Sequence, residues 1–256
     1  MSVLNTEWIK SYITNNHKLD EKTGETIYEP VLYRWSHGAT DYHMGAGMMY
    51  FSLVYYMKAR NCVCLGSGGG FVPRIMSQAR LELWKDQTVG GQEQYEFAET
   101  GTTIIVDACN GVNGVTDWDK KDSFFRLQFQ PRFLKTTTED AFYNFFVKQE
   151  FKIDYLHIDA DHSYEQVKWD FENYSTLLSE HGIITIHDTD SHYVDTNAIP
   201  QDHKDGTREP YDDVSGPIRL IKELEHDDEW QVFNFFDYGQ IREKPSSTGV
   251  TLLRRK

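Results

Sequence analysis

At residues 62–71 the chain reads Cys-Val-Cys-Leu-Gly-Ser-Gly-Gly-Gly-Phe, an apolar run of strand length followed by a turn with four glycines in five residues. Glycine serves tight turns in which the backbone must approach a ligand or adopt a positive φ angle. Pro73 follows, and proline suits the first turn of a helix because the amide hydrogen that it lacks would have no partner there. The stretch therefore predicts a strand, a glycine-rich turn and a helix, the repeating unit of α/β sheets.

The same alternation continues along the chain. Further strands are predicted at residues 103–106, 153–158, 183–186, 230–236 and 249–253. Helices are predicted at residues 8–13, 44–57, 137–146, 163–178 and 218–224, and Gly182 is expected to cap the fourth of these at its C-terminus. Alternating strands and helices predict an α/β fold, with a mostly parallel sheet and helices on both faces.

The composition excludes several classes of protein. Lys and Arg number 26 against 40 Asp and Glu, a net charge of −14, so binding to nucleic acid or to an anionic membrane is not expected. The N-terminus lacks the basic and apolar regions of a signal peptide, and no apolar run is long enough to span a bilayer. Three cysteines are too few for a disulfide framework, which predicts free thiols in a cytoplasmic protein, with Cys62 and Cys64 in the core.

The glycine turn favours a particular kind of ligand, because ligands of parallel α/β sheets bind at the carboxyl ends of the strands. Phe71 occupies the place of the third glycine in the dinucleotide fingerprint, and the Lys-Ser/Thr pair of an ATP-binding loop is missing. Gly66, Ser67 and Gly68 are therefore expected to contact a ligand without phosphate, such as S-adenosylmethionine (SAM). The alternative is a turn that only connects strand to helix.

Asp107 ends the next predicted strand. A carboxylate at this place can accept hydrogen bonds from the ribose hydroxyls of a nucleoside. The alternative is a local Asx-turn with Asn110 and Gly111. Asp107 lies farther beyond the glycines than the spacing of about 20 residues usual for such an acid, so residues 84–101 are expected to form an inserted loop.

Two neighbouring strand ends carry acidic and imidazole side chains, namely Asp159, Asp161 and His162 after one strand and His187 and Asp188 after the other. Carboxylate oxygens favour hard divalent ions, so Asp159, His187 and Asp188 are predicted to bind Mg²⁺ or Mn²⁺. His162 is the predicted catalytic base, since a cation close by would keep it neutral. The alternative is that Asp161 and His162 only cap the following helix.

Three phrases resemble class I SAM-dependent methyltransferases: Cys64-Leu-Gly-Ser-Gly-Gly-Gly70, Ile158-Asp-Ala-Asp-His-Ser-Tyr164 and His181-Gly-Ile-Ile-Thr-Ile-His-Asp-Thr189. The last two together are similar to the metal-dependent sugar O-methyltransferases of macrolide and cephalosporin biosynthesis. The resemblance covers about residues 60–190. It implies a Rossmann-like sheet of seven strands in a three-layer sandwich.

The resemblance also implies roles for residues that bind the cofactor. Gly66 and Gly68 would lie beneath the methionine part of SAM, Asp107 would hold the ribose, and Thr138 and Asp140 would lie at the edge of the adenine.

For the metal, the resemblance matches Asp159 and Asp188 to two ligands of the sugar enzymes and His162 to their base. Their third ligand is a Glu or Asp directly before the last Asp, where this chain has His187. This departure leaves the use of a metal open.

The predicted function is SAM-dependent methyl transfer to a hydroxyl group of a sugar, a glycan or a similar polyol. A metal-dependent hydrolase and a non-catalytic nucleoside-binding protein are the alternatives. Residues 1–43 are predicted to form an N-terminal extension that is a candidate for a homodimer contact, and residues 44–256 the methyltransferase domain. The polar segment 190–217 is predicted to be a lid or insertion.

Overall fold

The structure is a computed structural model that describes residues 14–19, 22–23, 26–30, 34–39, 43–90, 101–109, 129–190, 215–236 and 248–256. The predicted helix at residues 8–13 lies outside these ranges, as does most of the predicted lid. Within them, no helix is both long and apolar enough to cross a membrane.

Seven strands form one sheet, as the resemblance implied. Their order is β5 (Arg132–Leu134), β4 (Thr102–Val106), β3 (Asn61–Leu65), β6 (Ile153–Ile158), β7 (Leu178–His187), β9 (Val250–Arg255) and β8 (Trp230–Phe235). The first five strands are parallel, and β9 runs antiparallel between β7 and β8. The prediction of a mostly parallel sheet is confirmed.

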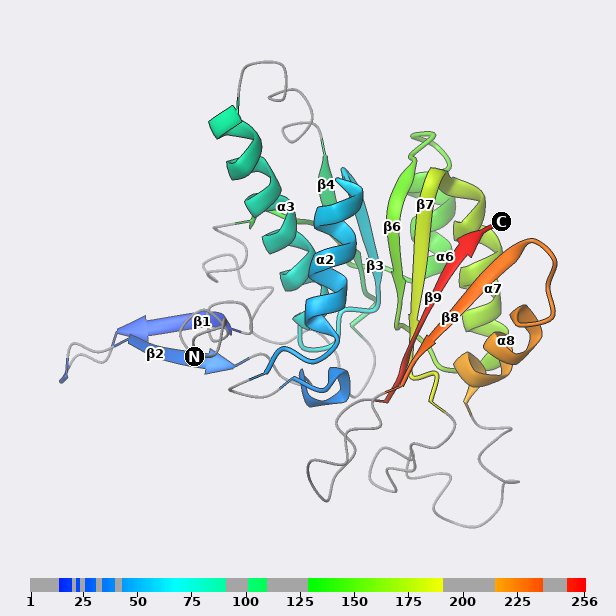
Figure 1. Cartoon of the computed structure of the whole chain (residues 1–256), viewed down its shortest axis with the longest axis horizontal. Helices are drawn as coiled ribbons and strands as arrows, with labels where there is room; N and C mark the ends of the chain where they lie inside the picture. The colour runs from blue at the N-terminus through cyan, green and yellow to red at the C-terminus, as the bar shows by residue number, and fades with distance from the viewer. Residues whose placement is uncertain are drawn as a thin grey trace, which may run out of the picture.

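Helices cover both faces of the sheet, which gives three layers (Figure 1). One face carries α2 (Gly47–Met57) and α3 (Phe71–Gly90). The other carries α6 (Thr138–Ala141) with its continuation η4 (Phe142–Phe146), α7 (Tyr164–Tyr174) and α8 (Gly216–Leu224).

Side-chain alternation along β3 explains why the sheet has two cores. Val63 and Leu65 pack into the core beneath α7, whereas Cys62 and Cys64 pack into the core beneath α2 and α3. Both cysteines are fully buried, and burial raises the pKa of the Cys62 thiol to about 12. The prediction that they are core residues is confirmed.

Three predicted boundaries differ from the structure. Helix α3 continues to Gly90, so the first part of the predicted inserted loop is helical, and α8 begins at Gly216, inside the predicted lid. Helix α7 starts as predicted, with the Ser163 side chain accepting a hydrogen bond from an amide of the first turn, but it ends at Tyr174.

Gly182 is a further difference, because it lies within β7 and caps no helix. A Cβ atom at Gly182 would lie 2.7 Å from the carbonyl oxygen of Ile153 on β6. The glycine is therefore required because the backbones of β6 and β7 approach closely at this point. A glycine of this kind and a glycine that caps a helix look the same in the local sequence.

The N-terminal region contains a separate antiparallel pair, β1 (Thr14–Leu19) and β2 (Thr26–Pro30), followed by the short helix η1 (Arg34–His37). Residues 36–39 pack on the main sheet. The Ser36 carbonyl accepts a hydrogen bond from the amide of Thr248, next to β9, and His37 is buried. The division between extension and domain at residue 43 stays a prediction.

Candidate active site

The glycine turn after β3 packs directly against the end of β6. Gly66 has a φ angle of +76°, and a Cβ atom there would lie 1.9 Å from the carbonyl oxygen of Asp159. Gly68 has a φ angle of +44°, and no described atom lies within 4 Å of the place its Cβ would occupy. The turn therefore touches the carboxylate-bearing strand end on one side and leaves open space on the other.

Asp107, at the end of β4, holds this turn in place. Its Oδ2 atom accepts hydrogen bonds from the amide (2.9 Å) and the hydroxyl (2.6 Å) of Ser67, and its Oδ1 atom accepts one from the amide of Cys109 (2.8 Å). The bond to Cys109 is an Asx-turn, made with a different partner from the two expected. Three of about four acceptor positions of the carboxylate are in use, so a ribose hydroxyl could still bind.

Asp159, His162 and Asp188 converge at the ends of β6 and β7, as predicted. His162 Nε2 lies 3.2 Å from Asp159 Oδ1 and 3.4 Å from Asp188 Oδ2. His187 Nδ1 lies 3.4 Å from Asp159 Oδ1 and 3.2 Å from Asp188 Oδ1. The two carboxylates are thus shared by two imidazoles, one nearly half exposed (His162, 47%) and one buried (His187, 2%).

The electrostatics of this cluster favour charged histidines. Burial acts to lower the pKa of His162, but Asp188 and Asp159 outweigh it and raise the pKa to about 9; the pKa of His187 rises to about 9 for the same reasons. Burial acts to raise the pKa of Asp159, but His187 and His162 hold it well below its ordinary value. Without a cation, the two imidazoles supply the positive charge that the carboxylates require.

Two further histidines border the cluster, and neither was predicted. His37 comes from η1, and its ring lies 4.0 Å from that of His187, centroid to centroid. His157, on β6, has its Nε2 atom 4.0 Å from Asp159 Oδ2 and its Nδ1 atom 2.8 Å from the hydroxyl of Thr185. Both rings are buried, and burial lowers the pKa of each, to about 3 for His157, so both are neutral.

His37 lies 122 positions before Asp159 in the chain and follows no strand of the sheet, so no local pattern marks it. His157 was visible on its strand, but period-two alternation is equally typical of an ordinary core histidine.

The remaining predicted residues lie at other places on the same edge. Thr138, at the start of α6 after β5, is buried. Its hydroxyl accepts a hydrogen bond from the side-chain amide of Gln166. Asp140 is exposed, and its own amide donates to the N-cap residue Thr137. Asp161 accepts a hydrogen bond from the amide of Ser163, the N-cap residue of α7, whereas His162 points to the carboxylates.

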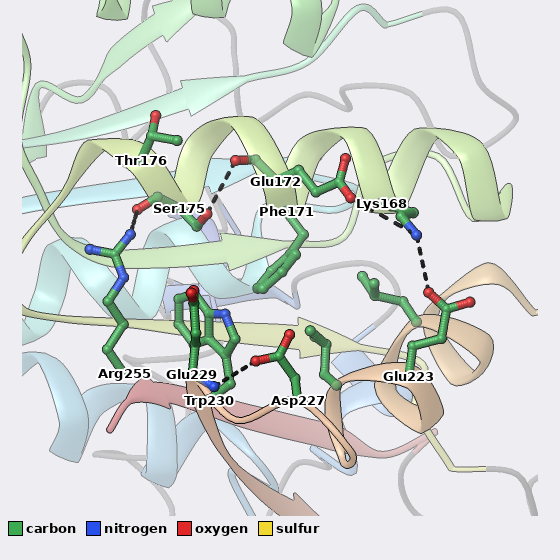
Figure 2. A pocket seen from close by; sticks show the side chains of 12 residues that line it. Lys168, Phe171, Glu172, Ser175, Thr176, Glu223, Asp227, Glu229, Trp230 and Arg255 are labelled. Atoms are coloured by element: carbon green, nitrogen blue, oxygen red, sulfur yellow. Dashed lines mark hydrogen bonds and ion pairs between the residues drawn. The ribbon is translucent and has the colours of Figure 1, made fainter.

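A groove of about 380 Å³ lies elsewhere, between α7, α8 and the last two strands (Figure 2). Figure 2 shows Phe171 and Trp230 at its floor, with Lys168 paired to Glu223 at one end and Arg255 bonded to the Ser175 carbonyl at the other. Its lining shares no residue with the cluster at the strand ends.

Comparison with known proteins supports a functional class. The sequence pattern of the family described as "Methyltransferase domain" matches residues 63–189, from β3 to the end of the cluster. None of the curated protein sequences compared with the chain is significantly similar to it.

Several solved structures share the fold. An O-methyltransferase from Bacillus cereus in complex with SAH is 14% identical, with a TM-score of 0.52 over 82% of this chain and 80% of that one. A putative caffeoyl-CoA O-methyltransferase from Staphylococcus aureus is 12% identical, with a TM-score of 0.53 over 82% and 83%. The O-methyltransferase TomG from Streptomyces achromogenes, in complex with SAM, is 11% identical, with a TM-score of 0.50 over 98% and 95%. At such identities the likeness demonstrates the fold.

Proposed function

We propose that this chain is a class I SAM-dependent methyltransferase and that it methylates a hydroxyl oxygen of a sugar, a glycan or a similar polyol. In this proposal His162 accepts the hydroxyl proton, and Asp159, His187 and Asp188 hold a divalent cation. The domain match favours methyl transfer over the hydrolase and nucleoside-binding alternatives.

The residues of the glycine turn fit SAM, which supplies a methyl group on a positively charged sulfur. Gly68 faces open space in a backbone conformation that side chains rarely adopt. Asp107 fixes the turn through Ser67 and keeps an acceptor position for the ribose. Thr138 and Asp140 are assigned to the adenine side by resemblance. Thr138 would act there through its backbone amide, since its hydroxyl and its carbonyl already accept hydrogen bonds from Gln166 and Tyr174.

The cluster also fits a divalent cation, which would supply positive charge that lowers the pKa of a bound hydroxyl. Two carboxylates offer oxygen atoms, and His187 Nδ1 is buried without a hydrogen bond from the described residues. A buried imidazole nitrogen that makes no hydrogen bond and has only two carboxylates as ion-pair partners fits a ligand set, because a cation can take the place of its proton. Two vicinal oxygens chelate better than one, which favours a polyol over a simple alcohol.

His162 is placed to remove the proton. It is the exposed member of the cluster, so an acceptor can reach it from solvent. Its pKa of about 9 arises from Asp188 and Asp159 acting against burial, so ligation of these carboxylates would bring the pKa down and free the imidazole to act as a base.

One observation carries the proposal: the glycine turn rests on the backbone of Asp159, whose side chain contacts His162. The cofactor cradle and the proton acceptor therefore adjoin, and methyl donor and hydroxyl can be held in the same crevice. Positioning of this kind, with proton removal, is the main contribution that a protein makes when the donor is already activated.

The test replaces His162 by Gln and measures two properties. With radiolabelled SAM and a panel of sugar nucleotides, oligosaccharides and catechols, kcat should fall about 100-fold or more, as expected for loss of a general base. Binding of S-adenosylhomocysteine (SAH), measured by calorimetry, should not change, because His162 does not contact the glycine turn.

The matched control is His226→Gln, an exposed histidine after α8, which should keep wild-type turnover. Undiminished turnover in His162→Gln would remove His162 from the mechanism. Methylation of catechols but of no sugar would overturn the proposed acceptor.

A further inference from the structure

Two groups of side chains in the cluster could each hold a metal ion, and the inner one includes a residue outside the predicted ligand set of Asp159, His187 and Asp188. His37, Asp159 and His187 each offer one donor atom, and these three atoms lie within 4.8 Å of one another. The outer set, Asp159, His162 and Asp188, shares Asp159 with it. The inner set is buried, since His37 is 5% and His187 2% exposed.

The hydrogen bonds of His187 orient its free nitrogen toward the carboxylates. Its Nε2 atom lies 3.3 Å from the carbonyl oxygen of Ser36, and a carbonyl can only accept, so Nε2 carries a hydrogen. Without a cation the ring is charged and Nδ1 carries the second proton; a bound cation would displace that proton and use the lone pair of Nδ1. No hydrogen bond from the described residues reaches Nδ1, although Asp159 and Asp188 lie beside it. Metal-binding histidines are typically held by such a bond from the second nitrogen to a carbonyl.

His37 is prepared in the same way. Its Nδ1 atom is 3.1 Å from the hydroxyl of Tyr50, and in the tautomer in which Nδ1 donates this hydrogen bond, Nε2 holds the lone pair. The ring is fixed between Phe71, against which it stacks at 5.0 Å, and His187 at 4.0 Å. A neutral ring in a packed setting can donate its lone pair without prior loss of a proton.

We propose that His37 and His187 together with Asp159 bind a transition-metal ion of the Fe²⁺, Co²⁺ or Zn²⁺ class in preference to Mg²⁺. Imidazole nitrogen favours these ions, whereas Mg²⁺ takes oxygen ligands almost exclusively. The inference deepens the proposed function and rests on its cation, but not on its acceptor or on methyl transfer.

The proposal gives the N-terminal extension a part in the site. Ser36 and His37 belong to it, and the Ser36 carbonyl also accepts the hydroxyl of Thr248 at 3.1 Å. A bound ion would thus join η1 to the ends of β6 and β7, segments that are distant in the chain.

The test uses the full chain after removal of metal by a chelator. Co²⁺ binding is followed by visible absorption, alone and against an excess of Mg²⁺ of about 100-fold. Mn²⁺ then serves as a spectroscopic probe, because a coordinated imidazole nitrogen modulates its electron spin echo.

Loss of a residue that supports a metal ligand typically costs about 10–100-fold in metal affinity. Because His37 is proposed as a ligand itself, His37→Gln should weaken Co²⁺ binding by at least this much and should reduce the nitrogen modulation. His226→Gln, the exposed control, should change neither. If His37→Gln fails to fold by circular dichroism, Tyr50→Phe replaces it. That variant keeps the His37 ring and removes its hydrogen bond, and should weaken Co²⁺ binding by about 10-fold.

The proposal would be overturned if Mg²⁺ readily displaced Co²⁺ or if the nitrogen modulation were absent. It would also be overturned by wild-type Co²⁺ affinity in folded His37→Gln, or in Tyr50→Phe where that variant is used. Nitrogen ligation without methylation of any sugar would refute the proposed acceptor alone. Sugar methylation with Mg²⁺ and without nitrogen modulation would refute this inference alone.

Discussion

Replacing Gly68 and Gly66 separately by alanine tests where the cofactor lies. Both residues have positive φ angles, so an alanine at either position costs about 1–2 kcal/mol of backbone strain. At Gly68 the added methyl meets no described atom within 4 Å, so strain should be the whole effect on stability. The methyl would project into the space in which the methionine part of SAM is proposed to lie.

At Gly66 the same change should cost more. The methyl would lie 1.9 Å from the Asp159 carbonyl oxygen, and both backbones are fixed by hydrogen bonds, from Gly66 to Val106 (2.9 Å) and from Asp159 to Leu65 (2.8 Å). Relief of the overlap requires at least one of these buried bonds to break, so strain and the broken bond together should cost about 3 kcal/mol or more.

Urea denaturation followed by circular dichroism measures the free energy of unfolding, and calorimetry measures SAH binding. Gly68→Ala should lose about 1–2 kcal/mol of stability and at least about 10-fold in SAH affinity. Wild-type SAH affinity in Gly68→Ala would refute the placement of the cofactor. A Gly66→Ala protein as stable as Gly68→Ala would refute the contact with Asp159.

Two other predictions concern the carboxylates of Asp170 and Asp107. Burial raises the pKa of Asp170 from 3.8 to about 6, although hydrogen bonds from neighbouring side chains act to lower it. The charged form of Asp170 therefore costs about 3 kcal/mol of stability at pH 7, and this cost disappears as the pH falls below about 4. Asp170→Asn should therefore raise the free energy of unfolding at pH 7 and leave it unchanged near pH 4. The control Glu172→Gln, on the exposed side of the same helix, should have little effect at either pH. An Asp170→Asn effect that is independent of pH would contradict the raised pKa of Asp170. Asp107→Asn should lower SAH affinity at least about 10-fold by weakening both the ribose contact and the turn, and calorimetry showing unchanged affinity would exclude Asp107 from the site.

The sequence predicted the candidate site best where the ligand-bearing residues follow strands. Asp159 and Asp188 were predicted to meet because parallel neighbouring strands end at one edge of the sheet, and β6 and β7 are such neighbours. His162 follows from the same reasoning, since it stands three residues after Asp159 in the turn that precedes α7.

The role of Asp107 illustrates a limit of this reasoning. Its position at the end of β4 was correct, but its hydrogen bonds to Ser67 join two turns that are 40 residues apart. A propensity for turn or strand describes one segment, and it carries no information on which distant segment supplies the partner.

Local pattern by itself determined most strands of the main sheet, most of the helices, the parallel sheet and the edge at which the site lies, because hydrophobic period and capping residues act within a few positions. It did not predict the N-terminal pair β1 and β2. Tertiary structure alone decided that His37 meets His187, that Gly182 allows the close approach of β7 to β6, and that His162 is exposed while His187 is buried. These outcomes depend on which distant segments of the chain pack against one another. Such long-range packing leaves no periodic pattern in the local sequence.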